Sequence, residues 1–96
     1  MAQKDYTLSN KFESIEDIIG SDFSSDVTYY IQNKGPNTLV GLESATEPTN
    51  YKNHGKFCPV MKELTHKKDG TDVLYVRSLT GTCDINITYA TVDAGE

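Results

Sequence analysis

Four side chains of this 96-residue chain have the chemistry to bind zinc or to act in nucleophilic catalysis. They are His54, Cys58, His66 and Cys83. A structural zinc site normally takes two ligands from one short C-x₂₋₄-C segment, and the two cysteines here lie far apart in the sequence. We therefore expect no metal site and no other cofactor.

A cysteine nucleophile needs a base, a group that orients the base and an oxyanion hole. His54 or His66 could act as the base, but nothing in the sequence positions either one. Pro59 follows Cys58 and removes one backbone N–H that an oxyanion hole could use. We predict that the chain has no catalytic residues and is not an enzyme. The cysteines are expected to be buried free thiols, with a disulfide as the alternative.

The charge of the chain is uneven. The formal net charge is −5, yet residues 52–68 carry five lysines, both histidines and a single acid. An acidic domain is a poor nucleic-acid binder, because phosphate contacts dominate that affinity. No stretch is apolar enough to span a membrane, and no secretory signal precedes the first strand, so synthesis in a cytoplasm is expected. The lysine-rich stretch is either a solvated loop or a basic patch that meets an acidic surface of a neighbouring copy or a host protein.

Short alternating runs predict a mainly β protein. Val27–Gln32, Asp72–Ser78 and Cys83–Tyr89 alternate apolar and polar residues as half-buried strands do. Turn residues at intervals near ten separate the runs, which favours a small antiparallel β-sandwich or barrel of six to seven strands. We predict an N-terminal arm with one short helix over residues 1–26 and a β-sandwich domain over residues 27–96.

The arm contains the expected helix, over residues 10–19. Asn10 and Glu13 resemble a capping box, the isoleucines that follow recur at helical spacing, and Gly20 suits the residue after the helix. A strand is the competing interpretation, because isoleucine is β-branched.

Three further strands are expected at 38–43, 57–60 and 61–66, the second of them at a sheet edge because of Pro59. Gly41 inside a strand indicates a bulge or a close approach. Asp69-Gly70 predicts a hairpin, and residues 79–82 are expected to join the last two strands as a pair.

The polar stretch 44–56 is the longest predicted loop. Loops on a rigid scaffold commonly carry the binding surface of a β module. We therefore predict partner binding at Tyr51, Lys52, His54 and Lys56, with Tyr51 as a contact anchor. A loop folded back onto the sheet would explain this tyrosine equally well.

Two segments together carry a resemblance. They are YYIQNKGPNTLVGLES at 29–44 and VLYVRSLTGT at 73–82, separated by a polar loop rich in Thr and Pro. In this pattern the chain resembles the small β-sandwich accessory proteins of tailed bacteriophages, of the head-decoration or fibre-associated kind. The resemblance implies a homo-oligomer, most often a trimer, that carries no catalytic site and works on the virion.

Two functions follow as hypotheses. The first is a structural assembly protein that decorates or cements a phage capsid, or belongs to a fibre, through contacts with the major capsid protein or another virion protein. The alternative is a phage-encoded binding protein that inhibits a host protein or captures a small ligand. Neither hypothesis involves a membrane or nucleic acid.

Overall fold

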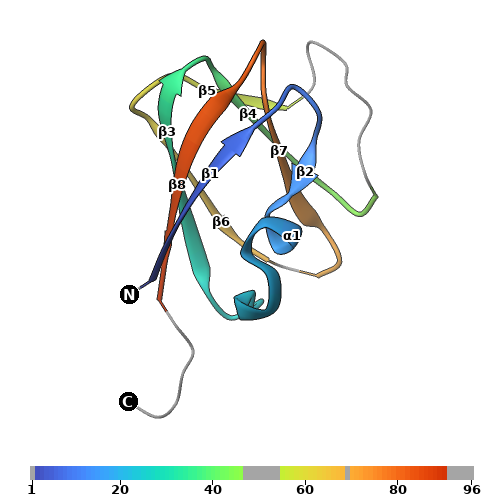
Figure 1. The fold of residues 1–96 in the computed structure, drawn as a ribbon. Coiled ribbons are helices and arrows are strands. Elements are labelled where there is room, and N and C mark those ends of the chain that lie inside the picture. The colour runs from blue at the N-terminus through green and yellow to red at the C-terminus, as the bar shows by residue number, and fades with distance from the viewer. Residues whose placement is uncertain (1, 47–54, 69, 91–96) are drawn as a thin grey trace.

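The computed structural model, which describes residues 2–46, 55–68 and 70–90, is a sandwich of two four-stranded antiparallel sheets (Figure 1). The first sheet has the order β1 (Ala2–Leu8), β8 (Cys83–Tyr89), β3 (Thr28–Pro36), β6 (Glu63–Lys67). The second has the order β2 (Glu13–Ser14), β7 (Val73–Ser78), β4 (Leu39–Ser44), β5 (Lys56–Cys58). The predicted mainly β fold is confirmed, and the described residues form eight strands.

The core lies between the two sheets and follows the alternation of the sequence. In β8 every second residue from Cys83 to Tyr89 is buried, and the residues between them are exposed or half-buried. Each large apolar side chain buried in this way contributes roughly 1.5–3 kcal/mol of transfer free energy. The buried residues of this cluster are Leu8, Ile15, Ile18, Ile19, Val27, Tyr29, Ile31, Leu39, Cys58, Leu64, Leu74, Val76, Cys83, Ile85, Ile87 and Tyr89.

The two predicted hairpin pairings are wrong. β6 pairs with β3 rather than with β7, and β8 pairs with β1 and β3 rather than with β7. β7 instead lies between β2 and β4 in the opposite sheet. A turn sequence shows where the chain reverses, but it does not show whether the next strand stays in the same sheet. Here the chain crosses between the sheets at each of these turns, which places successive apolar faces opposite each other.

Residues 2–14 contribute two strands to the sandwich. β1 forms an edge of the first sheet and pairs with β8 from Ala2↔Tyr89 to Leu8↔Cys83. β2 forms an edge of the second sheet and pairs with β7. Of the predicted arm, residues 2–8 and 13–14 are therefore part of the two sheets.

The helix is shorter than predicted. Helix α1 spans Ile15–Ile19, and a 3₁₀ turn, η1, follows at Gly20–Asp22. Ser14, not Asn10, caps α1, because its Oγ accepts a hydrogen bond from the Asp17 N–H at 3.1 Å. Pairing with β7 holds residues 13–14 extended and thereby delays the start of the helix. Gly20 ends it with φ of 78°, as the sequence predicts. Within the described residues, no helix is long and apolar enough to cross a bilayer.

The two ends of the sandwich differ. The strand directions place the β1–β2, β3–β4, β5–β6 and β7–β8 connections at one end, which we call the turn end. Helix α1 lies at the opposite end, the helix end (Figure 1).

Gly41 lies at a close approach of the two sheets, as its place in a strand predicts. A Cβ atom at this position would lie 2.7 Å from Leu64 Cδ1 on β6 and 3.5 Å from Leu74 Cδ1 on β7. Real Cβ atoms do not approach another carbon to 2.7 Å, so the residue must be glycine unless the leucine moves.

The Gly41→Ala substitution should lower the free energy of unfolding by about 1–3 kcal/mol, the usual cost of overpacking a core. Urea unfolding followed by circular dichroism measures it. Thr65→Ala, an exposed change on the facing strand, should cost less than about 0.5–1 kcal/mol and serves as the control. Equal stability of the Gly41→Ala variant and the natural protein would contradict the close approach.

Candidate functional site

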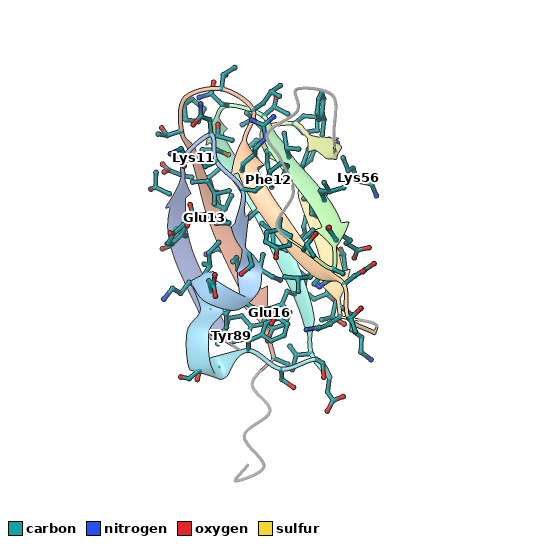
Figure 2. All side chains as sticks on the ribbon, turned by 90° about the vertical axis from the view of Figure 1, so that its right-hand side faces the viewer. Lys11, Phe12, Glu13, Glu16, Lys56 and Tyr89 are labelled. Carbon is teal, nitrogen blue, oxygen red and sulfur yellow. The ribbon has the colours of Figure 1, made fainter. Side chains whose placement is uncertain are left out.

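The predicted partner-binding residues fall mainly outside the described part of the chain. Tyr51, Lys52 and His54 are not among the described residues. Lys56 is described: it begins β5 and is exposed, and Figure 2 shows its side chain projecting from the edge of the second sheet. The partner role of all four residues stays a prediction.

Those residues that could do chemistry, as far as the structure describes them, serve as buried structural groups. Cys58 and Cys83 are free and buried, and His66 on β6 is only 3% exposed. Among the described residues, no group of three or more His, Cys, Asp or Glu side chains is placed to hold a metal ion. The buried polar groups instead make hydrogen bonds that organise the sandwich.

Asn33 organises the turn end. Its side chain is fully buried, and its Nδ2 donates to the backbone oxygens of Asn37 and Cys58, both at 2.9 Å. Its Oδ1 accepts from the Gly35 N–H at 2.8 Å and from the Cys83 thiol at 3.0 Å. One amide thus joins β3 and β8 of the first sheet to β5 of the second. Every hydrogen-bonding position of this buried group is occupied, which is what burial of an amide requires.

The backbone of Asn33 also holds the turn between β5 and β6. Its N–H donates to the Lys62 carbonyl at 2.9 Å, and its carbonyl accepts from the Met61 N–H at 2.7 Å. The Lys62 N–H closes the turn by donating to the Pro59 carbonyl at 3.0 Å. Within this turn Met61 has φ of 74°, a left-handed conformation that glycine adopts freely and that costs other residues about 1–2 kcal/mol.

The strained turn and the strand before it display apolar side chains to solvent. Phe57, Val60 and Met61 are 48%, 39% and 67% exposed, and we call these three residues the apolar tip. They account for three of the four large exposed apolar side chains among the described residues. Lys62 follows Met61 directly, and Lys34 lies on β3 next to the residue that binds the Met61 backbone; both lysines are exposed. The tip is therefore an apolar surface flanked by positive charge.

The tip is not predicted from the sequence. The pattern predicts an edge strand at 57–60 and a strand at 61–66, which places Met61 inside a strand, whereas the structure places it in a turn. One feature of the sequence could have indicated the tip: three large apolar residues, Phe57, Val60 and Met61, lie around Pro59 inside a lysine-rich segment. Alternation alone cannot show that these apolar residues face solvent.

A groove of about 800 Å³ opens between the sheets beside the tip. It runs between β6 of the first sheet and the β4–β5 edge of the second, and leucine side chains from three strands line it. Two carboxylates, Glu43 and Glu63, belong to the exposed part of its wall. The lining residues are Gly41, Leu42, Glu43, Gly55, Lys56, Glu63, Leu64, Thr65 and Leu74.

Carboxylates also connect the two sheets at both open sides of the sandwich. Glu43 Oε2 on β4 lies 2.8 Å from the buried His66 Nδ1 on β6. The His66 Nε2 is buried and has no hydrogen-bond partner in the described structure. On the other side, the Tyr6 hydroxyl of β1 donates to Glu13 Oε1 of β2 at 2.5 Å. This hydrogen bond, more than burial, raises the pKa of Tyr6 above its usual value.

The environment of the two thiols disfavours their reactive, deprotonated form. Burial raises the pKa of both Cys58 and Cys83 above the ordinary value of 9.0, and nearby carboxylates add to the rise. A hydrogen bond between Cys83 and the Gly35 backbone opposes part of that rise. The thiolate, which is the reactive form, is therefore disfavoured in the folded protein.

Comparisons with known proteins return no relatives: no family model, no curated protein and no solved structure matches this chain.

Both thiols should resist Ellman's reagent at pH 8 in the native protein and react fully after unfolding in urea. A Thr65→Cys variant, with an exposed thiol on β6, should react at once and serves as the control. Because the folded pKa values exceed the unfolded ones, the protonated thiols contribute stability that is present below about pH 9 and is lost as pH rises through the folded pKa. Rapid labelling of native Cys58 or Cys83 would contradict this account.

Proposed function

We propose that this protein is a non-catalytic assembly protein that acts through protein–protein contacts, with the apolar tip as its docking surface. The observation that carries the proposal is Met61. Its side chain is 67% exposed and contributes little to the core, while its backbone is held at φ of 74°. A residue that costs stability without packing inside the protein fits a role in contact with another molecule.

The flanking lysines indicate the chemistry of the partner. Lys34 and Lys62 lie beside the tip, so an acidic surface with an apolar depression complements it. Such charges raise the association rate and orient the partner, while the buried apolar side chains supply most of the affinity.

The narrower form of the proposal is a virion protein that decorates or cements the capsid of a tailed phage or belongs to its fibre. What supports it is the resemblance of residues 29–44 and 73–82 to the accessory proteins of such particles, together with the sandwich fold those proteins share. The partners would then be copies of this chain, with a trimer favoured, and the major capsid or another virion protein.

The groove favours the alternative function. Its volume of about 800 Å³ falls within the range of small-molecule sites, and it combines leucines with a few charged groups. A phage-encoded protein that captures a small ligand or inhibits a host protein would use the same side of the sandwich.

The Met61→Gly substitution should separate binding from folding. Glycine removes the exposed side chain and relieves a strain of about 1–2 kcal/mol, at an entropic cost of roughly 0.5–1 kcal/mol. The free energy of unfolding should therefore not fall, and should rise by up to about 1.5 kcal/mol. At the same time, co-sedimentation of the purified protein with the particle fraction of cells that produce it should fall at least about tenfold, as for the loss of a contact anchor.

Tyr30→Thr is the matched control, because Tyr30 is also an exposed apolar residue but lies in mid-β3, away from the turn end. It should leave co-sedimentation unchanged. If Met61→Gly is more stable and still co-sediments fully, or if the natural protein never sediments with a particle, the assembly proposal is wrong. Recovery of one host protein in stoichiometric amount would favour the alternative.

A further inference from the structure

We infer that the apolar tip binds the groove of a second copy of this chain. This inference rests on the proposed function, which makes the tip a docking surface, and it adds the identity of the surface that receives it. The receiving surface is the groove between β6 and the β4–β5 edge.

The apolar parts of the two surfaces match. The tip presents Val60 and Met61, which are 39% and 67% exposed. The groove is lined by Leu42 and Leu64, and Gly41 beside them has no Cβ that would displace the Leu64 side chain. Methionine is unbranched and flexible, so it fits an irregular apolar depression well.

The net charges of the two surfaces are opposite. Lys34 and Lys62 flank the tip, whereas the groove is lined by two carboxylates, Glu43 and Glu63, and one lysine, Lys56. The Glu43 side chain is 57% exposed, and only its Oε2 is engaged by His66, so Oε1 remains able to accept from a lysine. A tip-to-tip contact would bring lysines together, and a groove-to-groove contact would bring carboxylates together. The tip-to-groove contact is the one arrangement of these surfaces that the charges favour.

The positions of the two surfaces allow closed assemblies. Val60 and Met61 of the tip lie in the connection between β5 and β6, and the groove is lined by residues of the same two edge strands. Two copies related by a twofold axis can each insert a tip into the other's groove. Three copies can make the same contact in a ring, which is the trimer that the resemblance implies.

The experiment measures self-association of the purified full-length chain by sedimentation velocity, from micromolar to sub-millimolar concentration. The natural protein should form a species of two or more chains. Met61→Gly and the charge reversal Lys34→Glu should each weaken the dissociation constant at least about tenfold, the effect of losing one contact anchor or one complementary charge. Lys4→Glu, on the opposite edge of the first sheet, should leave association unchanged.

Charge rescue identifies the groove. Glu63→Lys alone should also dissociate the assembly, because it places a lysine against Lys34. An equimolar mixture of Lys34→Glu and Glu63→Lys should associate again, since each tip then meets a groove of opposite charge. Circular dichroism and urea unfolding confirm that each variant is folded.

A natural protein that stays monomeric over the whole range, or a mixture that fails to associate, would overturn the inference. The two proposals can fail separately. A monomer that still co-sediments with particles in a Met61-dependent way overturns the self-contact and leaves the assembly function standing. If the Met61→Gly substitution changes neither self-association nor co-sedimentation, both the self-contact and the assembly function are overturned.

Discussion

The turn end of this sandwich depends on the hydrogen bonds of one buried amide. Asn33 is fully buried, and its side chain satisfies groups from both sheets and from the β3–β4 connection. Replacing one partner of such a network leaves the others buried without hydrogen bonds, and each unpaired group costs about 1–3 kcal/mol. The thiol of Cys83 belongs to this network through its hydrogen bond to Asn33 Oδ1.

The same residue links the core to the surface. Its backbone binds Met61 and Lys62, and this pair of hydrogen bonds holds the β5–β6 turn in a conformation that Met61 would not otherwise adopt. The stability of the core thereby offsets the strain of the tip. A rigidly presented apolar side chain loses little conformational entropy on binding, which favours its use as a contact anchor. The groove beside it is shaped by the same pair of strands, with Gly41 allowing the leucines of facing strands to approach.

The sequence predicted the faces of the strands better than their partners. Alternation identified the buried residues of β8, and Gly41 and Pro59 indicated a close approach and a sheet edge, because each of these signals is local. The pairing of β6, β7 and β8 was mispredicted, because a turn looks the same whether the next strand stays in its sheet or crosses to the other. Asn33 lies just beyond the predicted strand Val27–Gln32, and its role depends on contacts with Cys58 and Cys83, which are distant in sequence. The exposure of the apolar tip was not predicted, because the type of an apolar residue does not show whether its side chain is buried or exposed.

The most direct test of the account is native-state hydrogen exchange of an Asn33→Asp variant. This substitution keeps the shape of the side chain and removes both donors of Nδ2. The account predicts that the amides of Gly35 and Met61 exchange at least about tenfold faster, as expected when about 1.4 kcal/mol or more of local stability is lost. The Asp17 amide at the cap of α1 should keep its protection, and Asn10→Asp, an exposed change at the same end, should alter none of these rates. Unchanged exchange at Gly35 and Met61, or an equal loss of protection at Asp17, would contradict the claim that Asn33 holds the turn end together.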